Sequence, residues 1–170
     1  RNNGSIRQQG VEFETSFNPV DPLTLSLSGT YLDSEYLDFR GAPNWPGRNP
    51  PFVDLTGERV PYSPEWQFTG FARWEDELPF NRDWRWSLRG DFQNVDERQL
   101  SATGDNYPLN KESSFTTFGA RLGLQSDTGL SIALLGQNLG EDIACTSRYV
   151  QPNNVGFGLV DTVNGGSVLR

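Results

Sequence analysis

Hydrophobic and polar residues alternate one by one along six stretches of the chain, and the 3.6-residue period of a helix is nearly absent. In residues 23–31, threonine and serine alternate with the residues of a second face, which are Leu23, Leu25, Leu27, Gly29 and Tyr31. Because successive side chains of a strand point to opposite faces, this pattern predicts strands with one apolar and one wet face. We therefore expect an all-β, antiparallel fold whose strands are residues 11–17, 23–31, 66–75, 84–93, 116–125 and 130–137.

Charged residues in these stretches are confined to one face of each predicted strand. The apolar face carries no charge, whereas the opposite face carries Glu12, Glu14, Arg73, Glu75, Arg85, Arg89, Asp91 and Arg121. A transmembrane β-barrel requires such a division, since a charge on its lipid face near mid-bilayer costs about 2 to 4 kcal/mol. A soluble β-sandwich also hides one face of every strand. Alternation therefore leaves both architectures open.

The lengths of the connections favour the barrel. Short connections at residues 18–22, 76–83 and 126–129 alternate strictly with long ones at residues 32–65, 94–115 and from 138 onward. Outer-membrane barrels show this alternation because their periplasmic turns are brief and their extracellular loops are extended. A sandwich has no physical reason to alternate in this way.

Aromatic residues gather at both ends of the apolar faces. Near the short connections they are Phe17, Trp74 and Trp84, and near the long connections they are Tyr31, Trp66 and Phe92. Amphipathic rings favour the headgroup level of a bilayer, so these positions predict one aromatic girdle at each membrane interface. The alternative is that they are core aromatics of a sandwich.

Six strands are too few to close a transmembrane barrel. Closed barrels have eight or more strands, and an unpaired strand edge in lipid costs several kcal/mol for each backbone group. The sixth strand would end on the outer side, whereas a barrel chain normally ends in the periplasm. We therefore expect residues 1–170 to be the C-terminal portion of a larger barrel, with a closing strand after Arg170. The absence of Met agrees with a clipped chain.

Composition excludes several classes of function. The chain has no His and a single Cys, so a Ser-His-Asp or Cys-His catalytic apparatus and a His-bearing zinc site are excluded. Its net charge is −8, and no basic stripe is present for nucleic acid. We expect no enzyme, no catalytic residues, no metal or cofactor, and no nucleic-acid partner.

Three segments resemble the C-terminal region of TonB-dependent outer-membrane receptors. Residues 5–14 (SIRQQGVEFE) resemble a recurrent strand opening of that family, in which a polar run and Gly precede V-E-x-E. Residues 57–66 resemble the segment that ends a long loop and begins a strand. Residues 137–142 (QNLGED) resemble the penultimate-strand signature N-L-F-D-x-x-Y. They depart from it at Gly140 and Glu141, and the nearest following aromatic is Tyr149.

This resemblance implies a 22-stranded barrel with an N-terminal plug, in which the present strands are the sixteenth to twenty-first. It also implies a receptor in the Gram-negative outer membrane that imports a scarce nutrient, such as a siderophore, cobalamin or carbohydrate. The implied partners are outer-membrane lipid and a TonB-type energising complex, which would act through an N-terminal region outside these residues. A passive porin and a soluble β-sandwich binding or adhesion domain remain as alternatives.

The sequence assigns no residue to ligand binding. The charged side chains of the lumenal face either bind plug carboxylates and carbonyls through forked arginine hydrogen bonds or pair with one another across neighbouring strands. The aromatics of the predicted loops either stack on a ligand or pack the loops themselves. These loop aromatics are Tyr36, Phe39, Trp45, Phe52, Tyr62, Tyr107 and Tyr149.

The loop carboxylates and the single cysteine carry no assigned role. The carboxylates of the first long loop lack the spacing of an EF-hand, so we predict no calcium site. They are Asp33, Glu35, Asp38, Asp54 and Glu58. Cys145, in the last predicted loop, either remains reduced or pairs with a residue outside this chain.

Overall fold

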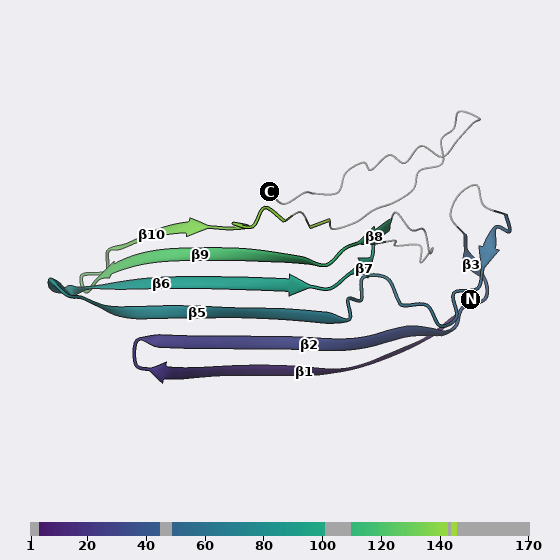
Figure 1. Cartoon of the computed structure of the whole chain (residues 1–170), viewed down its shortest axis with the longest axis horizontal. Coiled ribbons are helices and arrows are strands. Elements are labelled where there is room, and N and C mark those ends of the chain that lie inside the picture. Colours follow the sequence, from purple (N-terminus) through teal and green to yellow (C-terminus); the bar gives the residue numbers. More distant parts are fainter. Residues whose placement is uncertain (1–3, 45–48, 101–109, 143, 146–170) are drawn as a thin grey trace, which may run out of the picture.

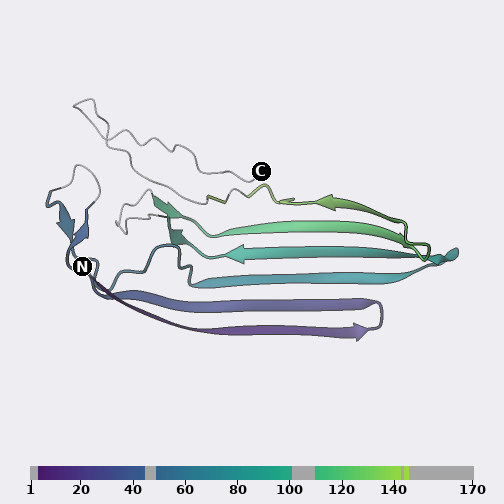
Figure 2. The same ribbon diagram turned by 180° about the vertical axis from the view of Figure 1, so that it is seen from behind.

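Six long strands lie side by side in one antiparallel sheet, in the order in which they occur along the chain (Figures 1 and 2). The structure is a computed structural model, and it describes residues 4–44, 49–100, 110–142 and 144–145. The strands are β1 (Ser5–Val20), β2 (Leu23–Asp38), β5 (Trp66–Leu78), β6 (Asn81–Val95), β9 (Phe115–Ser126) and β10 (Ser131–Gly136). The predicted all-β, antiparallel architecture is confirmed.

The register of the sheet brings the predicted apolar faces together. Leu27 of β2 pairs with Gly70 of β5, Gly70 pairs with Phe92 of β6, and Phe92 pairs with Phe118 of β9. β1 and β10 follow the same rule, since Val11 pairs with Tyr31, and Ile132 pairs with Leu124. A slip of one residue in any ladder would move a whole set of side chains to the other face. The six strands therefore present one continuous apolar face and one continuous polar face.

The connections divide the sheet into a turn end and a loop end, at the left and the right of Figure 1 respectively. At the turn end, two residues join β1 to β2 and two join β5 to β6, and the β9–β10 turn has Gly129 at a φ of 94°. Glycine adopts this left-handed conformation without steric cost. The two long connections between strands of the sheet lie at the loop end, so the predicted alternation is confirmed for the described residues.

The strand ends differ from the prediction, most of all at the loop end. β1 and β2 contain 16 residues each, more than the roughly 9 to 11 that cross a bilayer. Residues 5–10 pair with residues 32–38, which the sequence had placed in a loop. The prediction was wrong there because this part of the hairpin has no apolar face, so the alternation that marks a strand in the sequence is missing. At the turn end β5 also runs on to Leu78, which adds Asp76 to the apolar face opposite Trp86.

The long connections contain two short hairpins that the sequence did not predict. The first is β3 (Ala42–Pro43) with β4 (Phe52–Val53), and the second is β7 (Arg98–Gln99) with β8 (Lys111–Glu112). Each pairs only two residues per strand, which is too short to create a readable alternation. The first connection also returns along β2, where the Tyr36 N–H donates to the Glu58 carbonyl at 3.0 Å. The described parts of both connections therefore extend the sheet at the loop end.

The buried hydrophobic residues lie at the loop end rather than inside the sheet. They are Ala42, Leu55, Val95 and Leu100 among the described residues. On the apolar face, by contrast, Val11 is 65% exposed and Leu134 is 73% exposed. A β-sandwich would cover this face with a second large sheet, and the described strands supply only the single six-stranded sheet. No helix in the described part of the chain is long and apolar enough to cross a membrane.

Aromatic rings strengthen the apolar face toward the loop end. Tyr31 lies 4.8 Å from Trp66 between ring centroids, and Trp66 stacks on Phe68 at 5.5 Å. The rings of Phe13 and Phe68 lean over Gly29, where a Cβ atom would lie 2.5 to 2.8 Å from them. The absence of a side chain at Gly29 therefore leaves room for aromatic rings from the two neighbouring strands. Because this packing fits only one alignment of the strands, it also favours the observed register.

We predict that a charge in the middle of the apolar face destabilises the membrane-embedded protein. Leu88 is 49% exposed and lies midway between Trp84 and Phe92 on β6. Leu88→Arg should reduce the free energy of unfolding by about 2 to 4 kcal/mol, measured by urea titration in lipid vesicles. The matched control is Ser87→Arg on the neighbouring polar face, which should have a much smaller effect. Equal losses from both substitutions would contradict the assignment of faces.

Candidate functional site

The polar face carries all eight of the charged residues that the sequence assigned to the lumen. The structure brings only some of them together, and it does so along single strands. Arg73 Nε lies 3.8 Å from Glu75 Oε2, and Arg89 Nε lies 3.5 Å from Asp91 Oδ1. The other four form no ion pair within the described residues; they are Glu12, Glu14, Arg85 and Arg121. Of the two alternatives left open by the sequence, pairing of opposite charges across strands is not seen for these eight residues within the described part of the chain.

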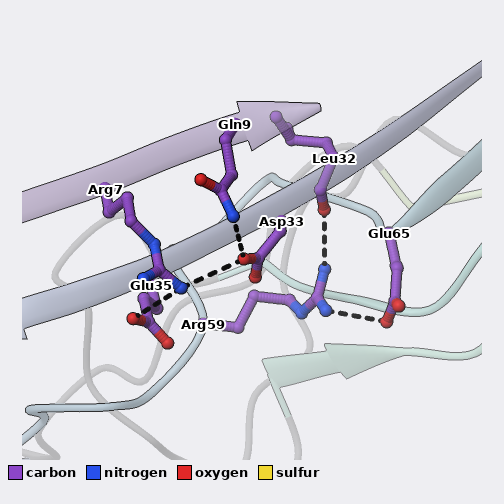
Figure 3. Close-up of polar contacts among 7 residues, drawn as sticks. All are labelled: Arg7, Gln9, Leu32, Asp33, Glu35, Arg59 and Glu65. Carbon is purple, nitrogen blue, oxygen red and sulfur yellow. Dashed lines mark hydrogen bonds and ion pairs between the residues drawn. The ribbon is translucent and has the colours of Figure 1, made fainter. Parts of the chain in front are cut away.

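The extended β1–β2 hairpin carries a cluster of charged residues beyond the aromatic residues of the apolar face (Figure 3). The Arg7 guanidinium lies between two carboxylates, 3.2 Å from Asp33 and 3.0 Å from Glu35. The Gln9 amide also donates to Asp33 at 3.3 Å. By register, these residues lie on the same side of the hairpin as Val11 and Tyr31. This side of the sheet therefore changes from apolar to charged beyond Tyr31.

Arg59 fixes the return of the first connection to the sheet. Its backbone pairs with that of Glu35 in an isolated β-bridge. Its guanidinium donates to the Leu32 carbonyl at 3.3 Å and lies 2.7 Å from the Glu65 carboxylate (Figure 3). Exposed ion pairs contribute only up to about 1 kcal/mol each. This arginine therefore acts mainly because its forked guanidinium bonds two partners at once, the Leu32 carbonyl and the Glu65 carboxylate. It ties the strand that leaves the membrane to the segment that enters it again.

The loop carboxylates named in the sequence analysis do not converge on one point. Asp33, Glu35 and Asp38 lie on β2 rather than in a loop, and Arg7 and Arg40 contact them. Asp54 accepts a hydrogen bond from the Thr56 N–H at 2.9 Å, and the hydrogen bonds from Thr56 lower the pKa of this carboxyl. Within the described ranges, no group of three acidic, Cys or His side chains has the arrangement of a metal site.

Three of the loop aromatics pack against their own surroundings. The rings of Tyr36 and Phe39 lie 4.8 Å apart, and burial raises the pKa of the Tyr36 hydroxyl. The Tyr62 hydroxyl donates to the Leu100 carbonyl at 2.7 Å and so joins the first long connection to the second. Phe52 of β4, in contrast, is 61% exposed. Trp45, Tyr107 and Tyr149 lie outside the described residues.

A cavity of about 310 Å³ lies between the two long connections. One side is formed by the first connection and the other by residues 96–97 and the β7–β8 hairpin. Its lining mixes both signs of charge: Glu58, Arg59, Glu65, Asp96, Glu97, Arg98 and Lys111 are among its residues. A lining of this kind offers hydrogen-bond donors and acceptors to a polar ligand. Sequence analysis missed the cavity because it combines residues from connections that are distant along the chain.

A buried ion pair anchors the last described segment to the second connection. Arg98 Nε lies 2.9 Å from Glu112, whose side chain is 5% exposed. The backbone N–H of Cys145 donates to the same carboxylate, and the Cys145 carbonyl accepts a hydrogen bond from Arg98 at 3.3 Å. Sequence analysis identified no partner for Cys145 within the chain, and the structure shows that its backbone is part of this clamp. We refer to Arg98, Glu112 and the Cys145 backbone as the loop clamp.

The segment after β10 continues alongside β9 in the same direction. The Leu139 N–H donates to the Phe118 carbonyl at 3.0 Å, and the Thr116 N–H donates to the Asp142 carboxylate at 2.9 Å. Asn138 has a φ of 50° and donates through its side chain to the Asp142 carbonyl. The residues of the predicted penultimate-strand signature thus terminate β10 and hold the next segment beside β9.

Comparison with known proteins agrees with this geometry. Residues 1–139 match the family described as TonB dependent receptor-like, beta-barrel, and no solved structure matches the chain. The match includes all six strands of the sheet and both long connections between them. Members of this family are outer-membrane receptors and transporters of Gram-negative bacteria. The chain therefore belongs to the TonB-dependent receptor-like β-barrel family and forms part of the wall of an outer-membrane barrel.

Proposed function

We propose that this chain supplies part of the barrel wall and of the extracellular surface of a receptor for a scarce nutrient. The receptor binds its cargo outside the cell and imports it with energy from a TonB-type complex. Residues 1–170 are the C-terminal portion of the barrel in this proposal, and a plug domain on an N-terminal segment contacts the energising complex. Membership of the receptor family and the organisation of the loop end support this proposal.

The observation that carries the proposal is the bonding between the two long connections. The Tyr62 N–H and hydroxyl both donate to the second connection, at Gln99 and Leu100. The loop clamp then fixes the segment around Cys145 to the same hairpin. Three consecutive extracellular segments thus form one ordered unit around a cavity, which suits selective binding. A wall that only retains an open channel has no need for this unit.

The lining of the cavity favours a polar cargo. It combines carboxylates with guanidinium and ammonium groups, so it can accept and donate hydrogen bonds to hydroxyl, amide and carboxylate groups. Siderophores, cobalamin and carbohydrates all carry such groups. Hydrocarbon cargo is disfavoured, because it would remove these charged groups from water without offering them hydrogen bonds.

A passive porin is the second candidate function. Its wall would share the division into apolar and polar faces, and nothing in the sheet itself distinguishes the two. The difference lies in the source of energy and in what fills the lumen. Energy dependence therefore separates the candidates.

We predict that uptake through the receptor requires the proton gradient, whereas binding does not. Cells that produce the full-length receptor should lose accumulation of a labelled cargo when TonB is deleted or the gradient is collapsed. Candidate siderophores, cobalamin and oligosaccharides are tested in turn, and cargo binding to isolated outer membranes is the control. Accumulation that persists without TonB would identify a passive pore instead.

We also predict that neutralising the buried carboxylate of the loop clamp loosens the extracellular unit. Glu112→Gln weakens charged hydrogen bonds that contribute roughly 1.5 to 3 kcal/mol each. Amide hydrogen exchange at residues 98–99 and 111–112 should accelerate by about tenfold or more, and cargo affinity should fall in parallel.

The matched control is Glu97→Gln on the same hairpin region. Glu97 pairs with Lys111 at 2.6 Å, but both side chains are more than half exposed, so the pair contributes less than about 1 kcal/mol. This variant should leave amide hydrogen exchange close to that of the unmodified receptor. Exchange alone is compared for it, because Glu97 lines the cavity. A loop clamp with no role would give the same small effect for both variants.

A further inference from the structure

A groove of about 540 Å³ crosses the apolar face of the sheet. It begins beside Phe17 of β1 and ends beside Phe118 of β9, so it runs across five strands rather than along one. At a strand spacing of about 4.8 Å, such a groove is about 19 Å long. Most of its lining side chains belong to the apolar face; they include Phe17, Leu25, Leu27, Ala72, Phe92 and Phe118. The face that meets lipid is therefore hollowed rather than smooth.

Small side chains that are in register form the floor of the groove. Ala72 of β5 is the partner of Gly90 of β6, and Gly90 is the partner of Ala120 of β9. A Cβ atom added at Gly90 would meet no atom of a non-neighbouring residue within 4 Å, so no described residue fills the space above it. In the next row toward the loop end, the Phe92 ring leans over Gly70, where a Cβ atom would lie 2.7 Å from the ring. The hollow thus has an aromatic wall on its loop side.

Leu139 closes the groove at its β10 end. Gly136 of β10 is the partner of Ala120 and would continue the floor, but the Leu139 side chain lies 2.9 Å from the position of a Cβ atom there. The Leu139 N–H donates to the Phe118 carbonyl at 3.0 Å, which holds the leucine in place. The end near Phe118 is therefore closed by an apolar group, whereas the end near Phe17 lies beside the β1–β2 turn.

The groove runs obliquely through the bilayer because the strands are tilted. Through the ladders of β5 and β6, Leu23 at the start of β2 is level with Leu122 of β9, yet β9 continues to Ser126 before its turn. The turns thus step along the strand direction, as in a barrel whose strands tilt by about 35 to 45°. Accordingly, Phe17 lies close to the last residue of β1, and Phe118 lies close to the first residue of β9. The groove rises from the turn side of the membrane toward the loop side.

The turn end of the sheet carries more carboxylates than cations. Among residues 18–22, 76–83 and 126–130 the basic residue is Arg82, and the acidic residues are Asp21, Asp76, Glu77, Asp83 and Asp127. This charge repels an anionic headgroup, such as that of phosphatidylglycerol or the phosphates of lipid A. A zwitterionic headgroup that carries an ammonium group finds hydrogen-bond acceptors there instead.

We propose that the groove holds one acyl chain of a zwitterionic phospholipid from the turn-side leaflet of the outer membrane. The chain lies over Gly90, its methyl end meets Leu139, and its ammonium group faces the carboxylates of the turn end. The groove is continuous with the face that the barrel turns toward lipid. A chain within it touches protein on more sides than a chain on a flat wall, so dispersion attraction holds it more strongly. This site goes beyond the proposed function, since it involves neither the cargo nor the energising complex.

Filling the space above Gly90 tests the proposal. Gly90→Leu places an apolar side chain in the groove, where the structure leaves room for its Cβ atom, and it keeps the lipid face apolar. Gly90→Ala adds a single methyl group and serves as a milder second variant, should the larger side chain impair assembly. The matched control is Leu134→Phe, which adds bulk to the same face at a 73% exposed residue outside the groove.

The experiment measures lipid that stays bound to the full-length receptor. Each receptor is reconstituted in vesicles that contain equal amounts of phosphatidylethanolamine and phosphatidylglycerol with the same chains. It is then extracted in mild detergent, and bound lipid is counted by native mass spectrometry. The unmodified receptor should retain phosphatidylethanolamine in preference. Retention should fall about tenfold in Gly90→Leu, as expected when about ten close carbon contacts are lost. Gly90→Ala should show a smaller loss, and Leu134→Phe should match the unmodified receptor.

Four outcomes would overturn the proposal. Equal retention of lipid by the unmodified receptor and Gly90→Leu would show that no chain is held above Gly90. An equal loss in Leu134→Phe would show that the effect is not specific to the groove. Preferential retention of phosphatidylglycerol would contradict the zwitterionic headgroup. A dimeric receptor that becomes monomeric in Gly90→Leu, with its bound lipid unchanged, would identify a second copy of the chain as the occupant.

Discussion

Backbone hydrogen bonding in a medium without water is the constraint on which the rest of this structure depends. Inside hydrocarbon each unpaired N–H or C=O costs several kcal/mol, so the strands must pair along their whole membrane-crossing length. The ladders between β1 and β10 meet this requirement for the four inner strands, with neighbours in sequence as neighbours in space, and the outer edges of β1 and β10 stay open in this sheet. Because side chains alternate between the two faces of a strand, a fixed register gathers the apolar residues on one face and the charged residues on the other.

Features at the loop end depend on this rigid wall. β1 and β2 extend past the aromatic residues of the apolar face, and Arg59 ties the returning chain to that extension. Tyr62 and the loop clamp then connect the first long connection to the second and to the segment around Cys145. Arg59 anchors the first connection to β2, and Tyr62 and the loop clamp join the described loop segments to one another.

The sequence predicted the fold well but the site poorly, for physical reasons. Contact with lipid requires an apolar side chain at every second position, as at Leu23, Leu25 and Leu27, so the strand can be recognised from the local sequence alone. Asp33 and Glu35 were misplaced in a loop because strands above the membrane lose their apolar face. The contact between Glu112 and Cys145 spans 33 positions, and the alignment of Arg73, Arg89 and Arg121 on neighbouring strands exists only through register. Neither leaves a local signal.

A scan of accessibility along β6 tests the central claim most directly, namely that this sheet separates lipid from lumen. Single spin labels at residues 84–93, in a receptor in which Cys145 is replaced by Ser, are exposed to oxygen as a lipid-soluble relaxant and to a water-soluble nickel chelate. Oxygen accessibility should peak at Trp84, Trp86, Leu88, Gly90 and Phe92, and chelate accessibility at the residues between them. Equal accessibility of both faces to the chelate, without a two-residue period, would contradict the account.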